Sequence, residues 1–224
     1  MDMNASYHLL VEKYLPHVRI VFDRYHMQAQ FGKDVLGSVR LEEAKAHRAE
    51  ADQYDILARE TEDRTQRDAL KRKAKQARHE YSVVKQSRWQ VLTSSKKLRV
   101  PGREKLDRIL EEHKDLAVCY AMKEELCQLF ELRDPDVARQ KWTDWFEGAK
   151  TSGIPQLVKF AELKEKRIEG LVSHAVFPIS TGKLEGFNNK IKVAKRTGYG
   201  YRNDDYFFTL IRYLSIPASG RFQT

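Results

Sequence analysis

The stretch from Leu41 to Val91 constrains the fold of this chain more than any other, because it contains neither glycine nor proline. It is densely charged between Arg59 and His79. A narrow set of apolar residues recurs at alternating spacings of four and three, which follows one face of an α-helix. These residues are Leu70, Ala74, Ala77, Tyr81 and Val84. The pattern predicts one long helix or a helical hairpin, projecting or lightly packed, whose basic residues are solvated or contact DNA.

Helical patterns continue beyond this stretch to about residue 175. Asp134-Pro135 marks the start of one such helix, since proline is common at the first helical position. That helix carries Trp142 and Trp145, which we expect in the core rather than as a platform for base stacking. Gly153-Ile154-Pro155 reads as a loop between helices.

The beginning of the chain is patterned differently. A short helix is predicted by the apolar residues Tyr7, Leu10, Val11 and Tyr14. Pro16 ends it, and the β-branched run from Val18 to Phe22 is typical of a buried strand. We therefore expect an α/β fold that is predominantly helical. Its three parts are residues 1–31 with the helix and the strand, a helical segment 32–175, and residues 176–224, which return to the α/β core.

The composition favours a polyanionic partner. The chain has 41 Lys and Arg against 32 Asp and Glu, a net charge of +9, and this balance suits DNA or RNA. No apolar run approaches the roughly 20 residues that cross a bilayer, and no secretory leader is recognisable, so we expect a cytoplasmic protein with no membrane partner.

Cys119 and Cys127 are expected to be reduced thiols, and no cysteine–histidine cluster has the spacing of a zinc site.

The most informative segment runs from Ser180 to Lys192 and continues as a helix. At 100° per residue its side chains divide between two faces. One face carries Glu185, Asn188, Asn189, Lys192 and Arg196, and the other carries Leu184, Phe187, Ile191 and Ala194. A single acid at the head of a helix can simply complement the helix dipole. The alternative is a metal-binding carboxylate beside a phosphate-binding face.

A second polar pattern, Asp23-x-x-His26, directly follows the expected strand. Together with other blocks it resembles the DDE insertion-sequence transposases of the ISL-three (ISL3) type, in the order of that family and over nearly the whole chain. The blocks are Asp2-Met3, Phe22-Asp23-Arg24-Tyr25-His26, Arg88-Trp89, Ala121-Met122-Lys123-Glu124, Glu185-Gly186-Phe187-Asn188-Asn189-Lys190-Ile191-Lys192 and Tyr199-Gly200-Tyr201-Arg202-Asn203. The Glu185 block, with the glycine–aromatic turn after it, is the most specific.

The resemblance implies a partial RNase H-like core, interrupted by residues 32–175 as a helical insertion, and metal-dependent DNA cleavage and strand transfer. It maps the second catalytic aspartate onto Asp2 and the glutamate onto Glu185, both as ligands of Mg²⁺ or Mn²⁺. The strand with the first aspartate is expected before residue 1. Asp23 is the rival of Asp2 as a ligand. Otherwise Asp23 and His26 are expected to support the site from behind or to form a structural pair.

The resemblance also implies a DNA partner, the ends of an insertion sequence. The full-length enzyme is expected to form a homo-oligomer in the bacterial cytoplasm, associated with the nucleoid when bound to DNA. Lys192, Arg196 and Arg202 are expected to hold phosphates rather than to read bases. Asn188 and Asn189 are expected to bind a phosphate or to hold the Glu185 carboxylate.

Three functions stay open on the sequence. The first is a fragment of a DDE transposase catalytic domain. The second is a catalytically inactive DNA-binding remnant of such an enzyme, because the first aspartate has no counterpart in the chain. The third is a helical scaffold protein with incidental basic charge, which explains residues 33–175 but not the Glu185 block. DNA binding that weakens steeply with salt would separate the first two from the third.

Overall fold

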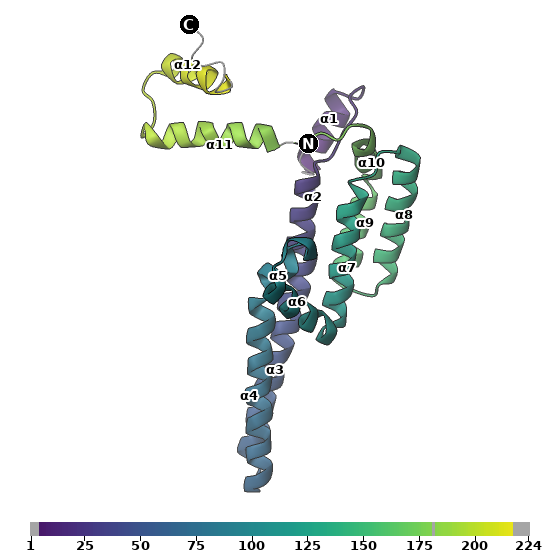
Figure 1. Cartoon of the computed structure of the whole chain (residues 1–224), viewed down its shortest axis with the longest axis vertical. Helices are drawn as coiled ribbons and strands as arrows, with labels where there is room; N and C mark the ends of the chain where they lie inside the picture. Colours follow the sequence, from purple (N-terminus) through teal and green to yellow (C-terminus); the bar gives the residue numbers. More distant parts are fainter. Residues whose placement is uncertain (1–4, 181, 217–224) are drawn as a thin grey trace. The chain divides into compact units, whose positions relative to one another are not determined.

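The structure is a computed structural model and describes residues 5–180 and 182–216. Within these ranges all regular structure is helical, as the ribbon in Figure 1 shows. The described residues fall into two compact units, one ending at Pro178 and the other beginning at Ile179. None of the described helices combines the length and the apolar character that crossing a lipid bilayer demands.

The predominantly helical character that the sequence predicts is confirmed, but the strand predicted for residues 18–22 is absent, and no strand of an α/β core occurs among the described residues. Helix α1 spans Ala5–Tyr14 and helix α2 spans Arg24–Phe31, with irregular backbone between them. A β-branched run becomes a strand only beside another strand, and the described ranges contain none. The segment instead docks on a helix: the Phe22 N–H donates to the Gly170 carbonyl at 3.2 Å, and the Phe22 ring is fully buried.

The chain from α2 to the first long helix continues without a break. A short π-helical segment, η1 (Gly32–Leu36), leads directly into α3 (Gly37–Glu60). Both glycines adopt ordinary helical angles, so they do not interrupt the helix. A side chain at Gly32 would meet Leu92 Cδ2 at 2.9 Å, which gives this glycine a packing role.

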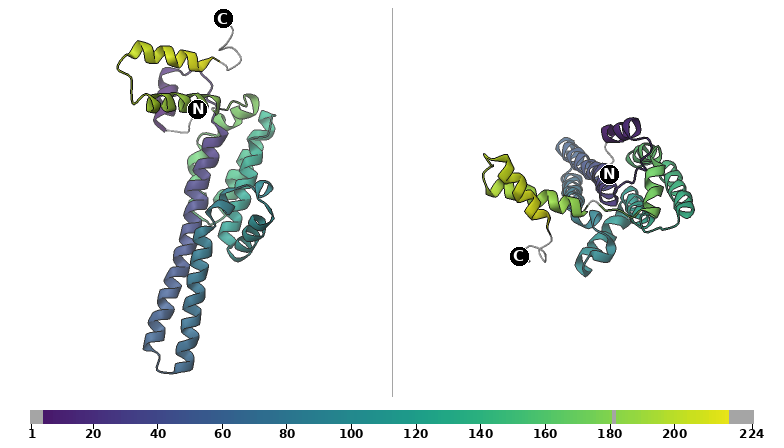
Figure 2. Two further views of the ribbon diagram at one scale, coloured as in Figure 1. Left: turned by 60° about the vertical axis from the view of Figure 1, so that its left-hand side comes forward. Right: turned by 90° about the horizontal axis from the view of Figure 1, so that it is seen from above.

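The glycine-free stretch forms a helical hairpin, one of its two predicted arrangements. Helix α4 spans Arg64–Gln86 and lies beside α3 along its length, as Figures 1 and 2 agree. Asp63 caps α4 by accepting hydrogen bonds from Thr65 N (2.6 Å) and Gln66 N (3.0 Å), the usual role of aspartate before a helix. Arg67 donates to the Thr61 carbonyl through two nitrogens. This carbonyl at the end of α3 therefore has hydrogen-bond partners within the turn.

Small residues line the inner faces of this hairpin. On α3 the buried residues Ala44, Ala51 and Ala58 are each seven apart, and on α4 the buried residues are Ala74, Ala77 and Val84. Small side chains allow the two helix axes to approach closely. Arg78 on α4 forms an ion pair with Asp55 on α3, so the charged residues flank the apolar contact.

The remaining helices of the first unit pack around an aromatic core. They are α5 (Arg88–Leu92), η2 (Ser95–Lys97), α6 (Val100–Glu112), α7 (Lys114–Leu129), α8 (Pro135–Thr151), α9 (Pro155–Glu165) and α10 (Ile168–Val176). Trp142 and Trp145 are buried, as the sequence predicts for core residues. Phe31 makes edge contacts with Trp145 and Phe160, so α2 is anchored against α8 and α9.

The second unit is a pair of helices, α11 (Gly182–Thr197) and α12 (Asp204–Ser215). The turn between them requires a left-handed backbone at Tyr199 (φ 48°) and Gly200 (φ 94°), which glycine adopts without steric cost. The ring of Tyr201 stacks on Phe207 with centroids 4.9 Å apart, and its hydroxyl donates to the Ala194 carbonyl at 3.2 Å. The glycine–aromatic sequence thus fastens α12 back onto α11.

Candidate functional site

The Glu185 segment forms a helix with one polar and one apolar side. Glu185 lies in the first turn of α11 and is partly exposed. On its side of the helix, four exposed residues follow: Asn188, Asn189, Lys192 and Arg196. Phe187, Ile191 and Ala194 on the opposite side are more covered. The residues that the sequence assigned to one face therefore do share one accessible helix surface.

The charge of α11 is strongly positive. Its sequence holds one acid, Glu185, against five cations: Lys183, Lys190, Lys192, Lys195 and Arg196. The positive end of the helix dipole lies near Glu185, and cations near the last turn complement the negative end. The Glu185 side chain is partly exposed, which suits both of its interpretations: a dipole partner and a metal ligand.

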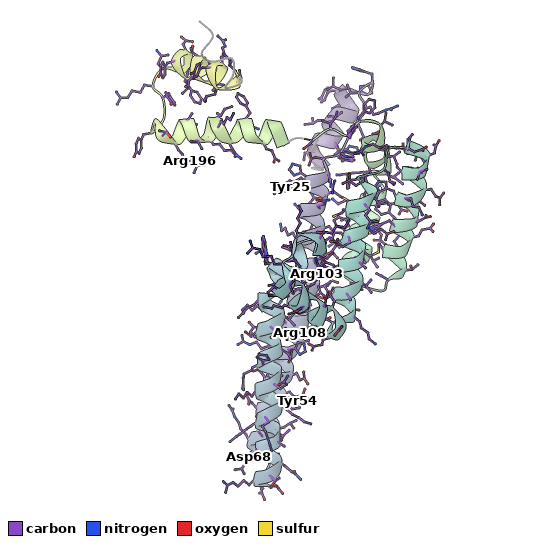
Figure 3. All side chains as sticks on the ribbon, in the orientation of Figure 1. Tyr25, Tyr54, Asp68, Arg103, Arg108 and Arg196 are labelled. Atoms are coloured by element: carbon purple, nitrogen blue, oxygen red, sulfur yellow. The ribbon has the colours of Figure 1, made fainter. Side chains whose placement is uncertain are left out.

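Arg202 extends the basic surface beyond the end of α11. It is exposed in the turn between the two helices, three residues after Tyr199 and its left-handed backbone. Figure 3 labels Arg196 near the end of α11 that leads into this turn. Lys192, Arg196 and Arg202 thus belong to one small unit, and all three are exposed.

Asp23 occupies a helix start in the first unit. It is 2% exposed, and its Oδ1 accepts hydrogen bonds from Tyr25 N at 2.7 Å and His26 N at 3.3 Å. This is N-capping of α2. The ring of His26 meets that of Tyr25 edge-on at 5.7 Å. Asp2, the other candidate aspartate, lies outside the described residues.

Lys123 and Trp89 belong to two other blocks of the family resemblance; the first is buried and the second is exposed. Lys123 is buried, and its ammonium donates to the carbonyls of Val91 (3.2 Å) and Thr93 (3.1 Å) and pairs with Glu124 at 3.0 Å. Burial lowers the pKa of Lys123, against the charge of Glu124. Lys123 therefore fixes the end of α5 to α7. Trp89 is 71% exposed, and packing does not account for it.

One group of potential ligands was missed by the sequence interpretation. Glu43, His47 and His113 bring one ligand atom each to within 4.8 Å of one another. Glu43 and His47 are four residues apart on α3. This spacing places both side chains on one face of a helix, so the pair could have been found from the sequence. His113 lies at the junction of α6 and α7, and only the tertiary fold brings it to α3.

Comparison with known proteins gives a consistent result. The family profile of the ISL3-type DDE proteins, described as "Transposase", matches residues 1–211. The transposase for insertion sequence element IS1001 of Bordetella parapertussis is 32% identical to the chain over 221 residues. The alignment covers 99% of this chain and 48% of that relative, so the chain spans about half the relative's length. No solved structure matches.

Proposed function

The chain belongs to the ISL3 family of DDE transposases, and on this premise we propose that it contributes part of the catalytic domain of a transposase. The activity of the complete enzyme is metal-dependent cleavage and strand transfer of DNA during the movement of an insertion sequence. The observation that carries the proposal is the accessible face of α11, where one acid stands at the head of a helix otherwise rich in cations.

In this proposal residues 1–31 and 176–224 belong to an RNase H-like core, and residues 32–175 form its helical insertion. The surroundings of α11 and α12 support the assignment. Of their side chains that the structure describes, none is buried, although α12 carries Phe207, Leu210 and Leu214 on one side. An apolar face left this open calls for a further layer of protein, and a core sheet supplies such a layer.

Glu185 and Asp2 are proposed as ligands of a divalent ion, Mg²⁺ or Mn²⁺. The donor set fits, since these ions prefer carboxylate oxygens and Glu185 is partly exposed. Glu185 and Asp2 would hold the ion, which would supply Lewis-acid stabilisation of charge on the oxygens at phosphorus. Asp23 is the weaker candidate, because its Oδ1 accepts hydrogen bonds from Tyr25 N and His26 N that hold the start of α2.

Binding of the DNA backbone is proposed for the rest of the α11 face. Lys192, Arg196 and Arg202 can each neutralise a phosphate, and Asn188 and Asn189 can donate an amide hydrogen to a phosphate oxygen or to the Glu185 carboxylate. Contacts of this kind hold the duplex in register without reading its sequence. The complete enzyme is proposed to act as a homo-oligomer on the ends of its insertion sequence.

The test is Glu185→Gln in the complete transposase, assayed on DNA that carries the ends of the insertion sequence. The substitution keeps the shape of the side chain and removes its charge. Cleavage should be abolished, while the affinity for DNA changes by less than about tenfold, because phosphate contacts supply most of that affinity. Cleavage at the wild-type rate would overturn the ligand role of Glu185.

The matched control is Glu147→Gln, at an exposed acid on α8, which should leave cleavage and binding unchanged. Loss of DNA binding together with cleavage in the Glu185 variant would instead point to a defect in folding or docking of α11. The inactive DNA-binding remnant, our second hypothesis, predicts that the complete wild-type protein binds DNA without cutting it in Mg²⁺ or Mn²⁺.

A further inference from the structure

Three potential metal ligands converge where the α3–α4 hairpin meets the rest of its unit. Glu43 and His47 are one helical turn apart on α3, and His113 joins α6 to α7. Their ligand atoms all lie within 4.8 Å of one another, and the rings of His47 and His113 meet edge-on at 5.3 Å. Two imidazoles and a carboxylate form a common zinc-binding set.

One pair of these ligand atoms lies at hydrogen-bond distance, a few tenths of an ångström short of the spacing that a zinc ion requires. His113 Nδ1 and Glu43 Oε2 are 3.1 Å apart. With bonds of about 2.0–2.2 Å to zinc, two ligand atoms of a tetrahedral site are separated by roughly 3.3–3.5 Å. The ligand atom of His47 lies within 4.8 Å of the other two, and its side chain is partly exposed, so a rotation of the side chain would have to bring it to the same ion.

His113 is a buried histidine whose place local structure does not explain. Its side chain is 6% exposed. The residue stands at the start of α7, but its side chain makes no capping hydrogen bond, so capping does not explain its presence. Its Nδ1 faces Glu43, and this contact does not account for His47 beside it.

The neighbourhood also favours a cation and allows one to enter. Glu50 Oε2, one turn beyond His47 on the same side of α3, lies 3.7 Å from His47 Nδ1 and adds a second negative charge. Glu43 and His47 are both partly exposed, so water can reach the cluster and fill a fourth coordination position. Imidazole ligands favour zinc over Mg²⁺, which prefers oxygen.

We propose that Glu43, His47 and His113 bind one zinc ion, which cross-links the base of the α3–α4 hairpin to the α6–α7 junction. The site shares no residue with the Glu185 face and differs from it in ligand chemistry. The ion would hold the base of the hairpin in place, because its three ligands come from segments that are about 70 residues apart in sequence.

The experiment is a calorimetric titration of the metal-free chain with zinc chloride, with excess Mg²⁺ present to occupy oxygen-rich sites. The wild type should bind one zinc ion and should melt at a higher temperature when zinc is added. His47→Ala and Glu43→Gln should each weaken zinc binding by at least about tenfold, since even indirect disturbance of a metal site costs about 10–100-fold. His113→Ala should do the same.

Two control variants test whether zinc binds at this cluster and not elsewhere on the chain. His79→Ala removes an exposed histidine from the same hairpin and should bind zinc like the wild type. Glu185→Gln should also bind zinc normally, which distinguishes this site from the proposed catalytic one. If His113→Ala fails to fold by circular dichroism, the two partly exposed positions decide the question. Zinc binding by His47→Ala at wild-type affinity, or no binding by the wild type, would overturn the proposal.

Discussion

Gly170 lies where the irregular segment before α2 packs against helix α10. A methyl group on Gly170 would overlap the buried ring of Phe22. In an open helix, replacing glycine by alanine stabilises a protein by about 0.5–1 kcal/mol. Here the overlap should reverse the sign, and we expect Gly170→Ala to lower the free energy of unfolding by about 1–3 kcal/mol, measured by urea denaturation.

Gly148 provides the matched comparison for this prediction. It lies inside α8, and apart from the neighbouring backbone of its own helix no atom lies within 4 Å of the position that its Cβ would take. Gly148→Ala should therefore raise the free energy of unfolding by about 0.5–1 kcal/mol. Equal stabilisation by both substitutions would mean that Phe22 does not pack against Gly170 in solution.

The candidate sites were predictable only where they are local. The two-sided face around Glu185 follows from helical periodicity, because all its residues lie within α11. The capping by Asp23 follows from the preference of aspartate for the position before a helix. The approach of His113 to Glu43 was not predictable, because no local rule determines which helix junction meets which face of α3.

Among the helices, the α3–α4 pair depends on small residues facing one another. Ala51 is completely buried in the middle of this contact, and a larger side chain there must push the helices apart. Ala51→Leu should lower the free energy of unfolding by about 1–3 kcal/mol. Thermal denaturation followed by circular dichroism would measure the change.

The control for this prediction is Ala49→Leu, two residues earlier on the same helix and exposed to solvent. Alanine and leucine have similar helix propensities, and a surface substitution usually changes stability by less than about 0.5 kcal/mol. If Ala51→Leu is as stable as Ala49→Leu, the hairpin does not hold its two helices in close contact.

The elements themselves were predicted unevenly, for a physical reason. A helix satisfies its own backbone hydrogen bonds, so the glycine-free stretch determines helices without reference to the rest of the chain. The reversal at Thr61 to Asp63 was harder to predict, because aspartate can also lie inside a charged helix. A strand depends on a neighbouring strand, and the run from Val18 to Phe22 has none in the part of the chain that the structure describes.

For the molecule as a whole, periodicity identified apolar faces but not what covers them. Helical spacing gives α12 an apolar side, yet Tyr206 is 62% exposed and no described side chain of α12 is buried. The stacked ring of Tyr201 supports Phe207, a contact that periodicity could not foresee. Burial is a property of two surfaces, so a face without its partner stays open however apolar it is.

The basic charge of the chain can be tested as a property of the molecule through the salt dependence of DNA binding. With 41 cationic and 32 acidic side chains, the chain should bind duplex DNA at low salt and lose affinity steeply as salt rises, by about 0.9 logarithmic units per phosphate contact for each tenfold increase in salt.

Lys192→Ala and Arg196→Ala should each reduce that slope by about one contact, whereas Lys141→Ala, at an exposed lysine on α8, should leave it unchanged. Equal effects at all three positions would mean that net charge attracts DNA without a defined surface. No binding at low salt would support the scaffold hypothesis instead. A loss of slope confined to the α11 variants would identify that helix face as the one in contact with the phosphates.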